Sequence, residues 1–328
     1  RPPRSTLFPY TTLFRSMLQS YKGIDFQRLL RSDLEGVDPH VANRLLSGRT
    51  RLRKGVVSHV YLHSKLQNRY AEADLDEAKS LTEDAGGAVS ARKKIHHSEA
   101  MVLGLVQGLK RIVAALHADG RRTTWGNYDT EHSYGEASFQ EKAAFVEKAA
   151  ARQHRKLVWD LGCNTGTFSR ICARHAEYVV SVDGDPRAID RLYEGTKRQG
   201  NEPLLPMIMN LANMSPGQGW GGTERKPFDG RGKPDLVLCL ALIHHIVISA
   251  NIPLVRFIEW LRTLDAEVVI EFVSASDDMA RMLLRNKENQ YSEMTEEGFE
   301  SIVAPMFDIV SSQSVKRGFR KLYHLAPR

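Results

Sequence analysis

From residue 156 onward, short apolar runs alternate with stretches that carry apolar residues at helical spacing. The runs cover residues 157–160, 178–182, 204–209, 235–240 and 267–272. Strands that alternate with helices form βαβ units, so this pattern predicts a parallel sheet covered by helices. Two further runs, 307–315 and 319–325, flank a basic turn at 316–318. They predict an antiparallel hairpin at the edge of that sheet.

The chain before residue 121 has a different pattern. Apolar residues recur at helical spacing, and no polar–apolar alternation is long enough to build a sheet. The helical spacing covers three segments, at 25–34, 41–46 and 98–116. Residues 121–150 form an aromatic-rich bridge that ends in a helical pattern over 140–150. We therefore expect a mainly helical region at 17–120 and an α/β domain at 121–328.

Residues 1–16 differ in character from the rest of the chain. The string TLFPYTTLFRS at 6–16 resembles the in-frame translation of a common sequencing adapter, and it has no period that buries one face. We interpret 1–16 as a sequencing-adapter artefact, with a genuine disordered tail as the alternative. Without its three arginines the formal net charge falls from +7 to +4. Adapter sequence stands at the end of assembled DNA, so we expect Met17 to be internal and native sequence to be missing before it.

Charge and cysteine content narrow the classes of function. A net charge of +4 is weak evidence for nucleic-acid binding, and the basic clusters at 49–54 and 92–94 are typical of solvated helix faces. The three cysteines are an odd number and no Cys/His spacing indicates zinc, so we predict neither a disulfide framework nor a metal site. The longest apolar run, 236–243, is far shorter than the roughly 20 residues of a membrane span. A reducing cytoplasm fits this composition best.

The residues with recognisable chemistry follow the first two predicted strands. The first strand runs into DLGCNTGTF, from Asp160 to Phe168, and the second ends at Asp183, 23 residues after Asp160. Glycines at such a turn let the backbone approach a ligand, and an acid after the second strand accepts hydrogen bonds from both ribose hydroxyls of a nucleoside. An aspartate at the turn repels a pyrophosphate but attracts the ammonium group of an amino acid. S-adenosylmethionine (SAM) carries that ammonium and no phosphate, so the pattern favours SAM over a dinucleotide.

Three strings carry a resemblance to a known family. VWDLGCNTGTFS, VVSVDGDP and DLVLCLALIHHI resemble the first, second and fourth motifs of class I SAM-dependent methyltransferases. The resemblance covers residues 120–328 and implies an α/β fold. Its sheet would be Rossmann-like, seven-stranded and mostly parallel with a C-terminal antiparallel hairpin, here preceded by the mainly helical N-terminal region. More narrowly, WGNYDTEHSYGEASFQEKAAFV and IEFVSASDDMARMLL resemble a bacterial nodulation-type (NoeA-like) group.

The resemblance implies cofactor contacts at ten positions. They are Asp160, Gly162, Asn164 and Gly166 for the methionine part of SAM, Asp183 and Gly184 for the ribose, Asn210 and Leu211 for the adenine, and Leu240 and Ala241 for the far wall. Two of these residues depart from the family pattern. Asn164 replaces the middle glycine of D-x-G-x-G-x-G, and Asn210 replaces an aspartate that binds the adenine amine. An asparagine carbonyl can accept the same hydrogen bond.

Further candidates lie where an acceptor would approach. His244 and His245 follow the fourth strand, and either is a candidate catalytic base for a hydroxyl acceptor. The alternative is a histidine that fills space and bonds to the backbone. Tyr128, Tyr134 and Lys142 precede the first strand, where they form either a lid and acceptor wall or ordinary packing.

Three functions are consistent with these residues. The resemblance and the modest charge favour a SAM-dependent methyltransferase with a small-molecule or glycan acceptor. An RNA methyltransferase is the alternative, with the basic clusters as the RNA-binding surface. A non-catalytic SAM-binding protein is a third, although the intact Asp160 and Asp183 argue against it. Arg320 in the final hairpin would face an anionic acceptor or only solvent. No pattern indicates a membrane partner or the oligomeric state.

Overall fold

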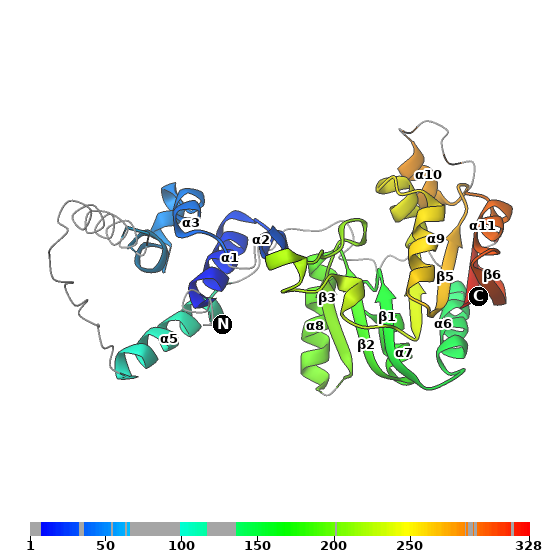
Figure 1. The fold of residues 1–328 in the computed structure, drawn as a ribbon, viewed down its shortest axis with the longest axis horizontal. Coiled ribbons are helices and arrows are strands. Elements are labelled where there is room, and N and C mark those ends of the chain that lie inside the picture. Colours follow the sequence, from blue (N-terminus) through cyan, green and yellow to red (C-terminus); the bar gives the residue numbers. More distant parts are fainter. Residues whose placement is uncertain are drawn as a thin grey trace, which may run out of the picture. The chain divides into compact units, whose positions relative to one another are not determined.

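The computed structural model describes most of the chain. The described residues are 8–32, 36–53, 55–62, 64–65, 99–116, 136–200, 202–285, 287, 291, 294–315 and 318–328. The chain divides into two compact units, residues 1–121 and 122–328, drawn from blue to cyan and from green to red in Figure 1.

The first unit is built from helices, and no strand occurs among its described residues. Its elements are α1 (Phe8–Lys22), α2 (Phe26–Ser32), α3 (Pro39–Leu45), the short helical turns η2 (Gly48–Leu52) and η3 (Val57–Tyr61), and α5 (Glu99–Ala114). The carboxylate of Asp38 caps α3 by accepting the backbone N–H groups of His40 and Val41, and Pro39 takes the first helical position. The helices expected over 25–34, 41–46 and 98–116 are confirmed, with ends that differ by a few residues.

Helix α1 includes residues 8–16, which the sequence analysis set aside. Leu13 and Phe14 are buried together with Met17 and Leu18, one turn further along the helix. They pack with residues of α3, η3 and α5, including Ala42, Val60, Leu109 and Ile112. The interpretation that this segment has no period that buries one face was therefore wrong, because Leu13 and Phe14 share the buried face of α1 with Met17 and Leu18. The foreign origin of residues 1–16 is a separate matter and stays a prediction.

The second unit contains the seven-stranded sheet that the sequence predicts. Its strands are β1 (Arg155–Leu161), β2 (Ala176–Asp183), β3 (Leu204–Ile208), β4 (Leu236–Cys239), β5 (Glu267–Val273), β6 (Phe307–Val315) and β7 (Arg320–Pro327). The strand order is β3-β2-β1-β4-β5-β7-β6. Figure 1 labels β3, β2, β1, β5 and β6 of this sheet. The first five strands are parallel, and β7 runs antiparallel to both β5 and β6. The expected C-terminal antiparallel hairpin is therefore confirmed, while residues 316–317 of its turn lie outside the described residues.

Helices cover both faces of the sheet because the strand residues alternate between two apolar clusters. Val158 and its neighbours pack with α6 (Glu136–Ala150), α7 (Thr167–Ala173) and α8 (Pro186–Gln199) on one face. Trp159 and its neighbours pack with α9 (Leu254–Thr263), α11 (Glu296–Val303) and the π-helical turn η7 (His245–Ser249) on the other. A small cluster joins η7 to α10 (Asp278–Leu284).

The strand order places three loops beside one another. The chain winds outward in opposite directions from β1 and from β4, and ligands bind outside the carboxyl ends of the strands at such a switch point. Asp160 of β1 lies in register with Ser181 of β2 and with Leu238 of β4. The turns that follow β1, β2 and β4 therefore meet at one edge of the sheet, and these turns carry most of the expected site residues.

Candidate functional site

The turn after β1 has a backbone that only a few residue types adopt readily. Gly162 and Gly166 have φ of 82° and 84°, and Asn164 between them has φ of 49°. These values lie in the left-handed region, which favours glycine and tolerates asparagine. The N–H of Gly162 donates to the carbonyl of Val182 at 2.8 Å, which ties the turn to β2. At Gly166 a side chain would also collide with α8, because its Cβ would lie 2.5 Å from the Cδ1 atom of Leu192.

Asp160 ends its strand as a buried carboxylate. It is 2% exposed, and its Oδ2 atom accepts a hydrogen bond from the Ser169 hydroxyl at 2.6 Å. Ser169 in turn accepts from the hydroxyl of Ser181 at 2.9 Å. Burial raises the pKa of Asp160 from 3.8 to about 6, and the nearby Asp183 adds to the rise while Ser169 and Lys142 oppose it. This carboxylate is poorly solvated, so a cationic ligand group would stabilise its charged form.

Asp183 ends β2 and accepts backbone hydrogen bonds with both of its oxygens. Oδ2 accepts the N–H of Asn164 and Oδ1 accepts the N–H of Asp185, each at 2.8 Å. Burial raises the pKa of Asp183, and these two hydrogen bonds oppose the rise. The backbone of Gly184 also contributes a hydrogen bond to this carboxylate. Each carboxylate oxygen has two lone pairs, so the side chain keeps capacity to accept a hydrogen bond from a ligand. Asp185 caps α8 by accepting the N–H of Arg187.

The electrostatics of this edge suit a cation and disfavour a phosphate. Asp160 and Asp183 interact closely enough for the charge of one to raise the pKa of the other. The Oδ1 atom of Asn164 is buried and has no hydrogen-bond partner among the described residues. A buried acceptor of this kind needs a donor to offset its desolvation. This set of acceptor oxygens therefore fits a ligand with an ammonium group and sugar hydroxyls, which SAM has.

The remaining expected cofactor residues lie on the loops after β2, β3 and β4. A Cβ added at Gly184 would meet only the Met209 carbonyl, at 4.0 Å. Asn210 is exposed, and its Oδ1 atom accepts the N–H of Ala212 at 2.9 Å, which caps the short turn η4 (Leu211–Asn213). Leu211 is half-buried.

The loop after β4 contains the expected far wall. Leu240 is buried, and Ala241 has φ of 50° although it carries a side chain. The next residue, Leu242, packs on the glycine-rich turn, because a Cβ at Gly162 would lie 3.3 Å from its Cδ1 atom. The structure thus brings the β1 turn and the β4 loop into contact.

The two histidines lie together at the start of η7. Their ring centroids are 4.2 Å apart, and His244 is 2% exposed while His245 is half-buried. Burial lowers the pKa of His244 to about 3, and the nearby His245 and Arg320 add to this decrease. Burial also lowers the pKa of His245. Both rings are therefore neutral at pH 7. The Nδ1 atom of His244 has no hydrogen-bond partner among the described residues.

A buried ion-pair network lies beside the histidines, and sequence reasoning missed it. The Lys142 ammonium donates to Glu271 Oε2 at 2.6 Å, and the Arg320 guanidinium donates to Glu271 Oε1 at 3.3 Å. Arg320 also makes a bidentate pair with Asp277, with both distances at 2.9 Å. All four side chains are at most 4% exposed. The signal in the sequence was an acid at position 271 inside an apolar strand, because such a residue needs buried partners.

This network changes the interpretation of two basic residues. Arg320 does not face an anionic acceptor or solvent, because its guanidinium is buried against Asp277 and Glu271. The expectation for Arg320 was wrong because the hairpin charge pattern did not show that β7 pairs with β5 in the sheet interior. Lys142 likewise binds Glu271 in the interior. The other two acceptor candidates, Tyr128 and Tyr134, lie outside the described residues.

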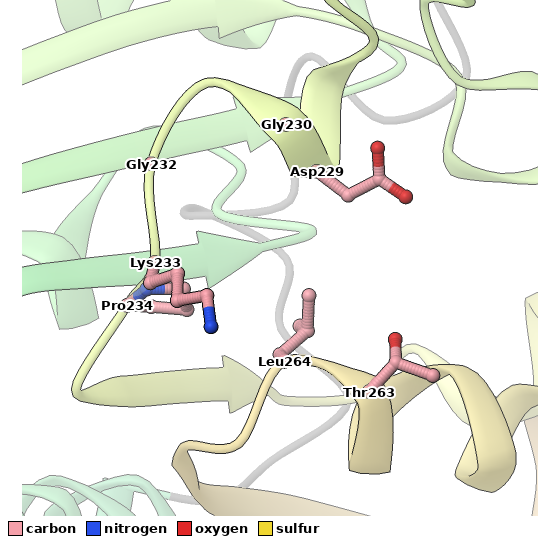
Figure 2. Close-up of a pocket in the computed structure, with 7 residues that line it drawn as sticks. All are labelled: Asp229, Gly230, Gly232, Lys233, Pro234, Thr263 and Leu264. Carbon is pink, nitrogen blue, oxygen red and sulfur yellow. The ribbon is translucent and has the colours of Figure 1, made fainter.

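A separate pocket lies at the opposite edge of the sheet. It has a volume of about 300 Å³, and Figure 2 shows Asp229, Lys233 and Thr263 around it. The chain from 229 to 234 leads into the amino end of β4, whereas the glycine-rich turn follows the carboxyl end of β1. This pocket is therefore not part of the site.

Among the described residues, no group of three or more His, Cys, Asp or Glu side chains is arranged to hold a metal ion. No helix in the described part of the chain has the length and apolar character of a membrane span.

Comparison with known proteins finds one curated relative of substantial similarity. No model of a known protein family matches the chain. The chain is 30% identical over 313 residues to "Nodulation protein NoeA" from Rhizobium meliloti (strain 1021). The aligned part is 94% of this chain but 62% of the relative, so the chain spans less than two thirds of that protein's length.

Comparison with solved structures finds proteins with limited likeness to part of this chain. The N-methyltransferase NodS from Bradyrhizobium japonicum WM9, in complex with S-adenosyl-L-homocysteine (SAH), is 14% identical with a TM-score of 0.43. The comparison covers 63% of this chain and 100% of that one. The protein PH0226 from Pyrococcus horikoshii OT3 is 16% identical with a TM-score of 0.42, over 61% of this chain and 98% of that one. Likeness at this level says nothing about which molecules the chain binds.

Proposed function

We propose that this chain is a SAM-dependent methyltransferase with a small-molecule or glycan acceptor. The observation that carries the proposal is a pair of carboxylates, the buried Asp160 and the half-buried Asp183, at the carboxyl ends of adjacent parallel strands. They flank a turn with three left-handed residues at the switch point of a seven-stranded sheet. A cationic amino acid joined to a nucleoside satisfies both carboxylates, and SAM is such a molecule.

The proposed contacts follow from the donors and acceptors at the site. Asp160 would accept the ammonium group, and the remaining lone pairs of Asp183 would accept the ribose hydroxyls. Asn210, Leu211, Leu240 and Ala241 would border the adenine and the far wall. When bound, SAM supplies a methyl group on a positively charged sulfur. The contribution of the protein is to hold the acceptor atom in line with that methyl group, because positioning accounts for much of the acceleration in such displacements.

The two histidines are assigned different roles within this proposal. A base is most effective when its pKa lies near the working pH, and the pKa of His244 is about 3. We therefore assign His244 a positioning role, in which its Nδ1 atom, which has no partner within the described part of the chain, hydrogen-bonds the acceptor. His245 is less buried and is our candidate for the base that takes the acceptor's proton.

Resemblance and charge are the observations that bear on the class of acceptor. The nodulation-type resemblance and the modest net charge support a small molecule or a glycan. RNA is the second candidate, because exposed basic side chains gather on short elements of the first unit, at Arg44, Arg49 and Arg53. The three cysteines are buried free thiols, which supports our proposal of a cytoplasmic location.

The test is titration calorimetry of the full chain with SAM and SAH, followed by incubation with radiolabelled SAM and fractionated bacterial extract. We expect binding of both nucleosides and label in a small-molecule or glycan fraction. The variant Asp160→Asn should lose binding, and the matched control Asp229→Asn, at an exposed loop position, should keep it. Absence of SAM and SAH binding would contradict the proposal. Label in an RNA fraction, with salt-sensitive RNA binding, would select the second candidate. Binding without transfer to any fraction would indicate a non-catalytic protein.

A further inference from the structure

Glu271 is a charged residue in the interior of the sheet. It lies near the middle of β5, it is fully buried, and its strand neighbours Ile270 and Phe272 are apolar and buried. A buried carboxylate is unfavourable unless charge-assisted hydrogen bonds compensate its lost hydration. Its Oε2 atom accepts the Lys142 ammonium at 2.6 Å and also the backbone N–H of Ala241 at 2.8 Å. One carboxylate oxygen therefore joins a helix side chain to the backbone of the β4 loop.

The bond to Ala241 holds an unusual backbone conformation. Residues with a Cβ seldom adopt a φ of 50°, and this conformation persists only where the surroundings enforce it. Ala241 follows Leu240, and the next residue, Leu242, packs on the glycine-rich turn at Gly162. Fixing the Ala241 backbone therefore fixes the wall that faces the β1 turn.

The bond to Lys142 brings helix α6 into the same arrangement. The Lys142 Nζ atom lies 5.0 Å from the ring centroid of Phe168, which is in the first turn of α7 after Gly166. Phe139 of α6 contacts the same ring, with centroids 5.7 Å apart. Glu271 is thus the point at which α6, the glycine-rich turn and the β4 loop are connected.

We propose that Glu271 is a positioning residue, which sets the Leu240–Ala241 wall of the cofactor cleft through the Ala241 N–H before the cofactor arrives. Lys142 neutralises this carboxylate and couples α6 to the wall, so it does not contact the acceptor. The proposal rests on the proposed function, because it takes the cleft beside Leu240 and Ala241 to be the SAM site. It assigns a role to a residue for which the sequence motifs gave none.

The test compares two double variants that differ in one carbonyl group. Lys142→Met with Glu271→Gln removes both charges and keeps an oxygen that accepts the Ala241 N–H. Lys142→Met with Glu271→Met removes both charges and that oxygen, with a side chain of similar length. We expect calorimetry to show that SAH binds about tenfold more weakly to the variant with Met at position 271 than to the variant with Gln there. The reason is that the Met variant loses one buried hydrogen bond, the one from the Ala241 N–H. Lys148→Met, at an exposed position on α6, should bind SAH like the wild type.

The readouts separate positioning from a merely structural role. A structural role would lower the melting temperature and leave SAH affinity unchanged in folded protein, so equal affinities of the two double variants would overturn the proposal. Hydrogen exchange in the wild-type protein gives a second measurement that does not depend on the folding of any variant. The Ala241 amide should exchange slowly before SAH is added, and exchange as fast as that of exposed loop amides would also overturn the proposal. Failure of the wild type to bind SAH would instead contradict the proposed function.

Discussion

The burial of Asp160 has a measurable effect on folding stability. Its pKa rises from 3.8 in an ordinary aspartate to about 6 in the folded chain, chiefly because the side chain is removed from water. Each pH unit between the two values is equivalent to 1.36 kcal/mol, so the ionised carboxylate costs the folded state about 3 kcal/mol. Asparagine at this position carries no charge, and its carbonyl can still accept the Ser169 hydroxyl. We therefore expect Asp160→Asn to be more stable than the wild type at neutral pH.

The pH dependence follows from which state binds the proton more tightly. Between pH 4 and pH 6 the folded wild type keeps the proton on Asp160 while the unfolded chain has lost it. The contribution of Asp160 to the free energy of unfolding of the wild type therefore falls as the pH rises through that window. At pH 4 and below, the wild type and the Asn variant should differ little. Above pH 7 the variant should be more stable by about 3 kcal/mol, a difference that no longer changes with pH.

Urea unfolding without added cofactor, at a series of pH values from 4 to 8, measures this difference directly. Asp229→Asn is the control, because Asp229 is exposed and its substitution should give no such pH-dependent gain. A stability difference that stays constant across the series, or a variant that becomes less stable as the pH rises, would refute the reasoning. The same variant should lose SAM binding, so stability and function should change in opposite directions at one side chain.

Three further predictions concern the same edge of the sheet. Asp183→Ala should weaken SAM binding by about 1–3 kcal/mol in calorimetry, because two ribose hydroxyls lose their acceptor, and unchanged affinity would show that the ribose lies elsewhere. The affinity for SAH should fall as the pH drops below about 6, since protonation of Asp160 removes the partner of the ammonium group. Calorimetry at pH 7.5 and pH 5 checks this, and equal affinities would contradict it. Gly166→Ala should lower the melting temperature, because the new Cβ would lie 2.5 Å from Leu192 Cδ1 in a left-handed backbone. Gly221→Ala is its control, because Gly221 has a similar left-handed backbone, with φ of 62° and ψ of 15° against 84° and 25° at Gly166, but open space around it. The difference between the two variants therefore measures the collision.

The local sequence determined the elements and the main carboxylates. The central strands β1, β4 and β5 each carry a short apolar run, because both of their faces are covered by helices. Asp160 and Asp183 could be found because each ends a run and their spacing is that of one βα unit. The cap at Asp185 could be found for a similar reason, since capping depends on residues within one turn of the helix.

Tertiary structure alone decided the surroundings of the charged residues. Arg320 and Glu271 are 49 residues apart and meet only because β7 inserts beside β5 in an antiparallel register. Lys142 and Glu271 are 129 residues apart, and their pairing depends on how α6 packs. A basic residue at the end of a strand has the same local pattern whether it faces water or a buried carboxylate. The difference comes from desolvation and long-range contacts, which a pattern of neighbouring residues does not encode.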